Sequence, residues 1–339
     1  MTNAAVIGGG YWGPNLIRNF GQLPNCKVKW ACDIDAKRLE HIKQIYPNIE
    51  TTTNVERLLE DPDVQAIAIA TPVATHFKLA EQSLTAGKHT FIEKPMARTS
   101  AECEKLIDIA DKESLILMIG HTFIYNPAVR KMKELIKSGV IGDILCLSAR
   151  RLNLGLFQND INVAWDLAPH DLAIILYLLD ESPTSLNCQG KAHLAPGIED
   201  VTNLSLYFNN GVFATVHSSW IDPNKVRQMT VVGTKGMIVY DDTEPLEKLK
   251  IYDKHVEVPP HYNGFGDFQF SYHYGGTHSP YIEQEEPLKI QTRHFIDCIE
   301  KSERPQTGGL EGLEIIRILE AASKSLQNDG SAVQLKPRA

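Results

Sequence analysis

The chain has 339 residues, a formal net charge of −8 and a sequence pI of about 5.9, with 43% hydrophobic and 22% charged residues. This length predicts two domains, and an acidic balance without a clustered basic patch excludes nucleic acid as the main partner. No apolar run approaches the roughly 20 residues that cross a bilayer and no signal peptide is visible, so we expect a cytoplasmic protein that does not bind membranes.

The six cysteines are scattered and form neither a C-x-x-C pair nor a metal-ligand spacing. Such usage is typical of reduced thiols in a cytosolic protein, so we expect neither a disulfide framework nor a zinc site. They are Cys26, Cys32, Cys103, Cys146, Cys188 and Cys298.

The N-terminal segment predicts a dinucleotide-binding loop. An apolar strand over residues 4–7 runs into Gly8, Gly10 and Gly13 with the spacing G-x-G-x-x-G, and a helix is expected over 14–20. In this context the first glycine permits a tight turn, the second lets backbone approach a pyrophosphate and the third lets helix and strand pack closely. The alternative is a loop in which the glycines occur by chance.

The next expected strand, 27–32, ends in Asp33. A carboxylate there can accept hydrogen bonds from the adenosine ribose and would repel a 2′-phosphate, which favours NAD over NADP. Arg38 lies close enough in sequence to weaken that preference. The alternative role for Asp33 is the N-cap of a helix over 36–45.

Strands and helices continue to alternate, which predicts an α/β domain with a parallel, doubly wound sheet over residues 1–120. Strands are expected at 64–70, 88–92 and 115–119, and helices at 76–86 and 99–112.

Glu93, Lys94 and Pro95 follow the strand 88–92 directly. Ligands of doubly wound sheets bind outside the carboxyl ends of the strands, and proline restricts the residue before it, so Lys94 is a candidate for chemistry. The alternative is a surface Glu-Lys pair that leads a helix.

The pattern changes after Gly120. An aromatic connection over 121–127 and a helix over 128–137 precede a series of strand-like runs, which predicts a second domain over 121–339 with a mostly antiparallel sheet. The runs are 144–152, 185–192, 201–208, 212–218, 228–232 and 237–240, with helices from about Pro169, over 287–302 and over 310–327.

The segment 259–280 is rich in Tyr, Phe, His and Gly without periodicity, and we expect a loop that acts as a lid or a subunit contact. Its His261, His273 and His278 are irregularly spaced and no carboxylate pattern accompanies them, so we expect no metal site there.

Asp166 and His170 are four residues apart at an expected helix start. Residues at this spacing share a helix face, so the carboxylate can position the imidazole, and with a lysine they make a general acid/base set for a hydroxyl proton. The alternatives are a partly buried structural histidine, and for the adjacent Asp171 a simple helix-start charge.

Three motifs occur in this order: Gly8-x-Gly10-x-x-Gly13, Glu93-Lys94-Pro95 and Asp166-x-x-x-His170. With these motifs at these separations, the chain resembles the Gfo/Idh/MocA oxidoreductases over essentially its whole length. The resemblance implies an N-terminal Rossmann domain that binds NAD and a C-terminal α/β domain with a large, mostly antiparallel open sheet, which makes a homodimer or homotetramer contact. It also implies that Lys94 and His170 handle the proton and that Asp166 is their partner in the substrate site.

By the same resemblance, one set of residues lines the cofactor: Gly8, Gly10, Tyr11, Trp12, Gly13, Asp33, Arg38, Thr71, Pro72, His76, Glu93, Lys94 and Asn126. A second set contacts a small-molecule substrate: Lys94, Tyr125, Arg150, Arg151, Asn153, Asp166 and His170. One departure is that Pro127, Ala128 and Val129 follow Asn126, where many members carry an arginine or tyrosine.

Within the family, the runs around Tyr11-Trp12 and Arg150-Arg151 are most similar to members that oxidise the 3-hydroxyl of UDP-N-acetylglucosamine or its uronate ahead of transamination. Guanidinium groups suit a diphosphate, but in an alternating strand only one of the two arginines can face the site, and both can instead be surface charges. Other open readings are a free-sugar or inositol dehydrogenase, a ketosugar reductase, an NAD-dependent glycosidase and a catalytically silent NAD sensor.

Overall fold

The computed structural model describes residues 1–257 and 270–336. The chain divides into two compact units, Met1–Tyr125 with Glu285–Glu320 and Asn126–Gln284 with Ala321–Ala339. The first division lies five residues beyond the boundary expected at residue 120. The sequence does not signal the return of residues 285–320 to the first unit.

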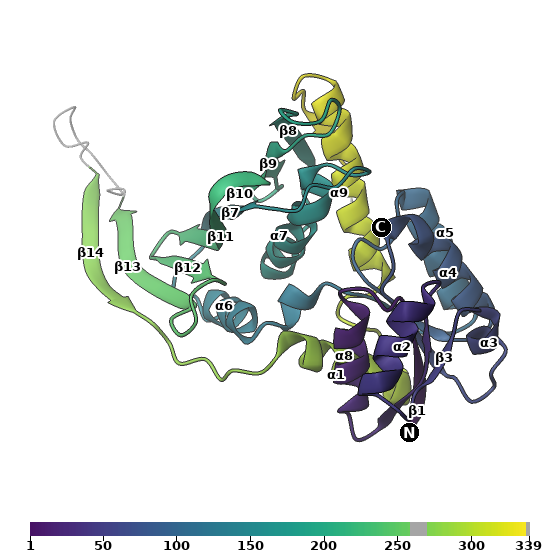
Figure 1. Ribbon diagram of the computed structural model, residues 1–339. Helices are drawn as coiled ribbons and strands as arrows, with labels where there is room; N and C mark the ends of the chain where they lie inside the picture. The colour runs from purple at the N-terminus through teal and green to yellow at the C-terminus, as the bar shows by residue number, and fades with distance from the viewer. Residues whose placement is uncertain (258–269, 337–339) are drawn as a thin grey trace. The chain divides into compact units, whose positions relative to one another are not determined.

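The first unit, in which Figure 1 labels β1 and β3, is built on a six-stranded parallel sheet in the order β3-β2-β1-β4-β5-β6. This is the strand order of a doubly wound dinucleotide-binding fold and confirms the predicted Rossmann sheet. Its strands are β1 (Thr2–Ile7), β2 (Cys26–Cys32), β3 (Glu50–Thr52), β4 (Ala66–Ile69), β5 (His89–Ile92) and β6 (Leu117–Ile119).

Helices connect these strands, and aromatic packing joins one late helix to them. Phe20, Phe91 and Phe295 come from α1, β5 and α8, are all fully buried, and meet edge to face with ring centroids 5.8 to 6.3 Å apart. This contact explains why α8 belongs to the first unit. The helices are α1 (Gly13–Gly21), α2 (Ala36–Ile45), α3 (Glu56–Leu59), α4 (Val73–Thr85), α5 (Ser100–Lys112), the 3₁₀ turn η1 (Thr122–Tyr125), α8 (Pro287–Lys301) and α9 (Gly309–Gln327), within which the division falls.

The second unit contains a nine-stranded sheet in the order β14-β13-β12-β11-β7-β10-β9-β8-β15. All neighbours are antiparallel except β7 and β10, which confirms a mostly antiparallel sheet. Helix α7 packs on β7, β9 and β10, and α6 packs on α7 and β12 (Figure 1). The elements are α6 (Pro127–Lys137), α7 (Val163–Leu179), β7 (Ile144–Leu154), β8 (Ser185–Lys191), β9 (Val201–Tyr207), β10 (Phe213–Ser219), β11 (Ile221–Gly233), β12 (Met237–Asp241), β13 (Leu249–Glu257), β14 (Ser271–His278) and β15 (Val333–Gln334).

Two sequence predictions about the second unit are wrong. Helix α7 begins at Val163, because Asn162 caps it by accepting from the main-chain N–H of Trp165, and Pro169 lies inside it. Because proline is common at the first position of a helix, the sequence analysis placed the start of this helix near Pro169, which is too late in the chain. The expected loop over 259–280 contains the strand β14, whose glycines and aromatic residues obscure its alternation; residues 258–269, with His261, lie outside the described part of the chain.

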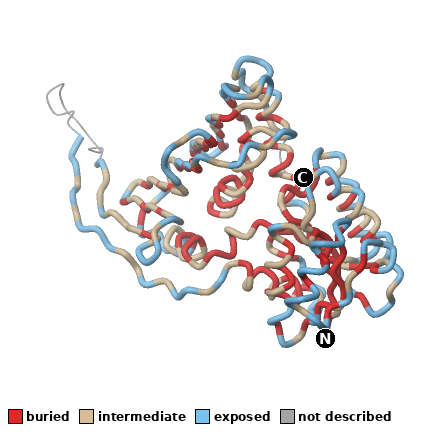
Figure 2. The backbone as a smooth tube through the Cα atoms, viewed as in Figure 1, coloured by how far each residue is buried: buried red, intermediate tan, exposed pale blue. Residues whose placement is uncertain are grey.

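The buried residues concentrate on the central strands of each sheet, as Figure 2 shows in red. All six cysteines are free, and five of them are buried. Among the described residues, no helix combines the length and the apolar character that a membrane crossing requires.

Candidate functional site

The glycine loop between β1 and α1 has the geometry of a pyrophosphate cradle. Gly8 has φ +103°, and an added Cβ at Gly13 would lie 1.7 Å from the carbonyl oxygen of Gly8, so strand and helix approach too closely for a side chain. At Gly10, by contrast, the nearest atom to such a Cβ is 3.6 Å away, on Arg38. The side chain of Trp12, the N-cap residue, makes no capping hydrogen bond, so no side chain covers the start of α1, where the positive end of the helix dipole favours an anion. These residues fit NAD.

Asp33 lies at the carboxyl end of β2, beside this loop. Its Oδ2 accepts from the main-chain N–H of Gly9 at 2.6 Å, and its Oδ1 accepts from Asp35 at 2.8 Å. The guanidinium of Arg38 is 3.4 Å from the same carboxylate. Asp35, not Asp33, caps α2, so the alternative role for Asp33 is excluded. The carboxylate is therefore held where the ribose of a dinucleotide would lie.

Trp12 and Glu93 form a contact that sequence reasoning missed. The indole N–H of Trp12 donates to the Glu93 carboxylate, and the exposed ring of Tyr11 stacks on Trp12 with centroids 6.2 Å apart. A Cβ on Gly120 would lie 2.8 Å from Oε2 of Glu93, so that glycine leaves room for the carboxylate. Burial raises the pKa of Glu93 to about 7, although the Trp12 donor and the Lys94 charge oppose the rise.

The Glu93→Gln variant is expected to gain stability relative to the wild type as the pH rises from about 4.5 to 7, by an amount of the order of 3 kcal/mol. The folded-state pKa of Glu93 exceeds its unfolded value, so its contribution is fully present below the unfolded pKa and is lost as the pH rises through the folded one. Urea unfolding of the NAD-free protein at several pH values measures this. The exposed Glu40→Gln on α2 is the control, and parallel curves for E93Q and the wild type would contradict the effect.

His76 on α4 ties two loops together. Its Nδ1 lies 2.8 Å from the carbonyl oxygen of Pro95, and its Nε2 lies 2.8 Å from that of Thr71. Burial lowers the pKa of His76, although both carbonyls oppose the fall. Both ring nitrogens have main-chain partners, so His76 holds the loop at Thr71 next to the loop at Pro95. Pro72, which follows Thr71, is the N-cap residue of α4. Its contact with the cofactor stays a prediction.

Lys94 follows β5 at the carboxyl edge of the sheet, and its peptide bond to Pro95 is cis. Nearby, His121 follows Gly120 at the end of β6 and is only 2% exposed. Neither of its ring nitrogens has a hydrogen-bond partner among the described residues. Burial, with the charge of Lys94, lowers the pKa of His121 to about 3, so the ring is neutral at physiological pH. His121 is thus a candidate that the sequence analysis missed; its place directly after a sheet strand was the available signal.

In the second unit, Asp166 and His170 lie on one face of α7, because they are one helical turn apart. Both are half-buried. The indole N–H of Trp220 donates to Oδ2 of Asp166 at 3.0 Å, which fixes that carboxylate. Asn153 and Trp220 both border Gly155, so Asn153 lies close to this group of residues. Their spacing on the helix thus agrees with the predicted acid/base set, and their roles stay predictions.

The two arginines of β7 leave the sheet on opposite faces. Arg151 is buried on the face covered by α7, where its Nε and Nη2 donate to the two oxygens of Asp171 at 2.8 and 2.9 Å. Arg150 is exposed on the other face. Asp171 is therefore a buried ion-pair partner and not a helix-start charge. This arrangement speaks against both arginines as diphosphate ligands, because Arg151 already has a carboxylate and Arg150 points away from α7.

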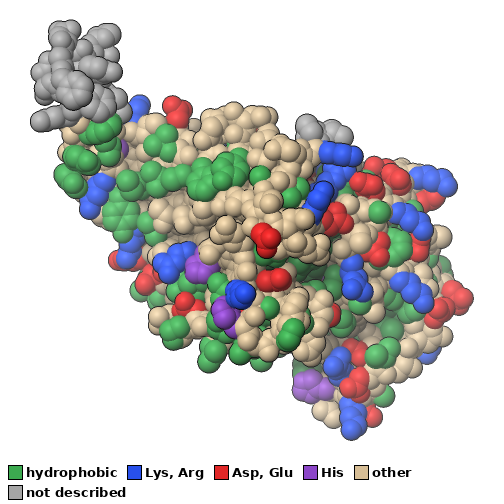
Figure 3. Space-filling view, turned by 90° about the horizontal axis from the view of Figure 1, so that it is seen from above, with side chains coloured by type: hydrophobic (Ala, Val, Ile, Leu, Met, Phe, Trp, Pro, Cys, Tyr) green, Lys and Arg blue, Asp and Glu red, His purple; other side chains and the backbone are tan. Residues whose placement is uncertain are grey.

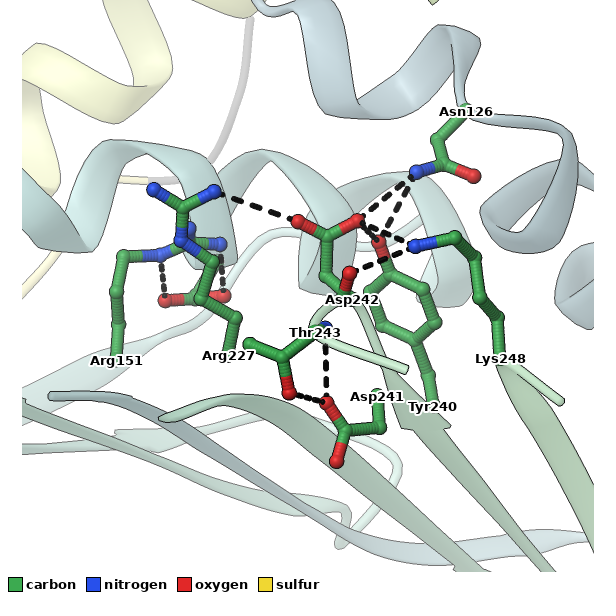
Figure 4. A network of polar contacts seen from close by, with 9 residues as sticks. Asn126, Arg151, Arg227, Tyr240, Asp241, Asp242, Thr243 and Lys248 are labelled. Carbon is green, nitrogen blue, oxygen red and sulfur yellow. Dashed lines mark hydrogen bonds and ion pairs between the residues drawn. The ribbon is translucent and has the colours of Figure 1, made fainter. Parts of the chain in front are cut away.

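Asn126 belongs to a polar network of the second unit, shown in Figure 4. Its oxygen caps α6, and its Nδ2 donates to the Tyr240 hydroxyl at 3.1 Å and to Asp242 at 3.3 Å. Arg227 and Lys248 also point toward Asp242. Because the amide is engaged on both sides, a direct contact of Asn126 with the cofactor has no support from these hydrogen bonds.

Tyr125 does not occupy the substrate-binding position predicted for it. Its side chain is fully buried, its hydroxyl lies 3.1 Å from Oγ1 of Thr307, and its ring packs on His294. The sequence predicts an aromatic connection after Gly120, and in the structure Tyr125 of that connection anchors the 3₁₀ turn η1 in the core of the first unit.

Comparison with known proteins agrees with this architecture. Residues 2–121 match the model of the Gfo/Idh/MocA oxidoreductase family, NAD-binding Rossmann fold, and residues 129–239 match its C-terminal domain. A UDP-N-acetylglucosamine 3-dehydrogenase of Acidithiobacillus ferrooxidans is 32% identical over 179 residues, 52% of this chain and 55% of that protein. A scyllo-inositol 2-dehydrogenase (NAD(+)) of Bacillus subtilis is 24% identical over 353 residues, 99% of this chain and 96% of that protein.

A solved structure supports the fold of the whole chain. The UDP-N-acetylglucosamine 3-dehydrogenase GnnA from Acidithiobacillus ferrooxidans superposes with a TM-score of 0.80 and 23% identity, over 97% of this chain and 99% of that one. The two domain matches, the glycine loop between β1 and α1 and the strand order all indicate the same family. The chain therefore belongs to the Gfo/Idh/MocA family of NAD-binding oxidoreductases.

Proposed function

We propose that this protein oxidises a ring hydroxyl of a sugar with NAD, and that its substrate is a nucleotide-linked sugar, UDP-N-acetylglucosamine oxidised at its 3-hydroxyl. The observation that carries the reaction is Lys94, which follows β5 at the same sheet edge as the glycine loop. The choice of substrate rests on the Acidithiobacillus relative that is named for this reaction.

The strand order supports this use of the sheet edge. Asp33 ends β2 on one side of β1, whereas Glu93 and Lys94 follow β5, two strands away on the other side. A dinucleotide with its ribose at Asp33 and its pyrophosphate at Gly10 would extend toward β4 and β5. Its reactive ring would then lie on the side of Lys94.

The glycine loop and Asp33 would hold NAD, which would supply the hydride acceptor for the sugar carbon that becomes the carbonyl carbon. In this proposal the role of His170 is that of the general base for the hydroxyl proton. The role of Lys94 is to donate a hydrogen bond that stabilises negative charge developing on the substrate. Asp166, held by the indole of Trp220, orients the His170 ring. The products are the 3-keto sugar, NADH and one proton.

The test is near-ultraviolet absorbance of the purified protein with NAD and UDP-N-acetylglucosamine, with the keto product removed by an amine or an aminotransferase. NADH formation that disappears when the UDP group is omitted is the expected result. No NADH with this sugar or its uronate would overturn the substrate. Turnover without net NADH, with release of an aglycone, would indicate an NAD-dependent glycosidase instead.

A second candidate is an inositol or free-sugar dehydrogenase, because the Bacillus inositol dehydrogenase aligns over nearly the whole chain. The ion pair of Arg151 with Asp171, which engages one of the two arginines predicted to bind a diphosphate, also favours it. NADH formation with scyllo-inositol or free glucose, at least equal to that with the nucleotide sugar, would select this candidate.

We also propose that the protein is a cytoplasmic homodimer or homotetramer that associates through its nine-stranded sheet. Tyr207 and Phe213 are partly exposed there and pack with ring centroids 5.2 Å apart. Elsewhere on the face drawn in Figure 3, hydrophobic side chains gather near the larger of the two grey groups. Exposed apolar patches of this kind mark contact surfaces. Light scattering of the purified protein measures the assembly, and a monomer would contradict it.

A further inference from the structure

The strands β13 and β14 form a two-stranded arm at one edge of the nine-stranded sheet (Figure 1). Beyond Leu249, no described side chain of either strand is buried, and Figure 2 draws the arm in tan and pale blue. An isolated two-stranded hairpin is marginally stable in water, so the arm gains little from apolar burial. Something other than a hydrophobic core must hold its two strands in register.

One face of the arm gathers histidines and carboxylates. Asp253, His255 and Glu257 share this face of β13, because side chains alternate along a strand. His273 lies directly opposite His255 on β14, and the two rings stack with centroids 4.7 Å apart. The donor atoms of Asp253, His255 and His273 all lie within 4.8 Å of one another.

A bulge in β14 brings the carboxylate into this group. The register places Tyr252 opposite Thr277 and Lys254 opposite Tyr274, so Gly275 and Gly276 together oppose Asp253. A Cβ on Gly275 would lie 2.0 Å from Oδ2 of Asp253, so the carboxylate occupies space that only a glycine leaves. Asp253 thus leans across the strand boundary toward His273.

Two ring nitrogens of the cluster make no hydrogen bond to a described residue. Nε2 of His273 is 3.0 Å from Oδ1 of Asp253, yet its geometry makes no hydrogen bond, and Nδ1 of His255 has no partner among the described residues. Both atoms are shielded from solvent. Ligand atoms that lie this close together, with two ring nitrogens that make no hydrogen bond to a described residue, are available to a metal ion.

The second ring nitrogen of His255 has a carboxylate of its own. Nε2 lies 3.5 Å from Oε1 of Glu257, and the Ser271 hydroxyl donates to the other oxygen of Glu257 at 3.0 Å. A carboxylate behind a histidine that binds metal through its other nitrogen is the usual way such a ring is oriented.

We propose that Asp253, His255 and His273 bind a divalent transition-metal ion and join β13 to β14 through it. Two imidazoles and one carboxylate suit Zn²⁺, which takes nitrogen and oxygen ligands at about 2.0–2.2 Å in tetrahedral geometry and leaves its fourth position to water here. Tetrahedral ligands at that distance are about 3.3 Å apart, so the three side chains close on the ion by rotamer changes. The irregular spacing in sequence conceals this site, since cross-strand pairing creates it. The proposal is independent of the dehydrogenase reaction.

The experiment is a calorimetric titration of the chelator-treated, full-length protein with Zn²⁺. One ion per chain is expected to bind, and His255→Ala and His273→Ala are expected to abolish that binding. His278→Ala, an exposed histidine at the end of the same strand, is the matched control and should bind like the wild type. Glu257→Gln should weaken binding by about 10- to 100-fold, since it removes only the orienting carboxylate.

Far-UV circular dichroism and NAD binding show whether each variant is folded. If the histidine variants fail to fold, the visible spectrum of the wild-type protein with Co²⁺ decides, because a tetrahedral site gives intense absorption and an octahedral aquo ion does not. The proposal is overturned by a wild-type protein that binds no Zn²⁺, by a weak octahedral Co²⁺ spectrum, or by equal Zn²⁺ binding in a folded His255→Ala/His273→Ala double variant.

Discussion

Replacing Lys94 with alanine is expected to lower kcat by about 10²- to 10⁴-fold, while the dissociation constant for NAD stays nearly unchanged. The ammonium group is proposed to stabilise charge on the substrate oxygen, a contribution that exists only during the reaction. The residues proposed to hold NAD are mainly the glycine loop and Asp33, and the contacts described for them above do not involve the lysine side chain. Steady-state kinetics and NAD titration by fluorescence measure the two quantities.

Lys112→Ala is the matched control for this variant. Lys112 is the last residue of α5 and its side chain is 82% exposed, so its loss should leave both kcat and NAD binding as in the wild type. Wild-type turnover in Lys94→Ala would show that the role proposed for Lys94 is wrong. A loss of NAD binding equal to the loss of turnover would make Lys94 a cofactor ligand instead.

His170→Ala is expected to reduce kcat/KM by about 10²- to 10⁴-fold, because the proposed general base is removed from the hydroxyl proton. The fall in activity toward acid pH should also flatten, since that limb reports protonation of the base. Added imidazole should restore part of the activity. A purely structural role for the ring would produce neither the altered pH profile nor the rescue.

The control for this variant is His41→Ala, an exposed histidine on α2. It should reproduce the wild-type pH profile and show no response to imidazole. Full activity in His170→Ala would remove this residue from the mechanism. It would also leave Asp166, with its hydrogen bond from Trp220, as a structural contact of α7.

The pair Arg150 and Arg151 shows a rule that sequence reasoning predicted correctly and a partner, Asp171, that it did not predict. Alternation along a strand requires the two side chains to leave on opposite faces, and they do. Which face carries the chemistry, and which partner each side chain finds, depends on α7 and its Asp171, twenty residues later in the chain. That contact turns a predicted diphosphate ligand into half of a buried ion pair.

The β13–β14 arm is a second case in which residues far apart in the sequence come together only when the chain folds. His255 and His273 are separated by a segment whose length gives no metal-binding spacing, so their meeting is visible only once the strands pair. The bulge at Gly275 and Gly276, which leaves room for Asp253, likewise cannot be predicted before the register of the two strands is known.

The sequence by itself determined the features that depend on neighbours along the chain. The glycine spacing after β1, the alternation of strands and helices, the charge on Asp33 and the turn at Lys94 and Pro95 are local patterns, and each reflects backbone sterics or periodicity within a few residues. Only the tertiary structure decided the partners of buried charges. It placed the Trp12 indole on Glu93 and both nitrogens of His76 on main-chain carbonyls. It also buried His121, whose two ring nitrogens have no hydrogen-bond partner in the described part of the chain. Such contacts join distant segments, and burial, which sets the pKa of Glu93 and His121, is a property of packing that no local pattern contains.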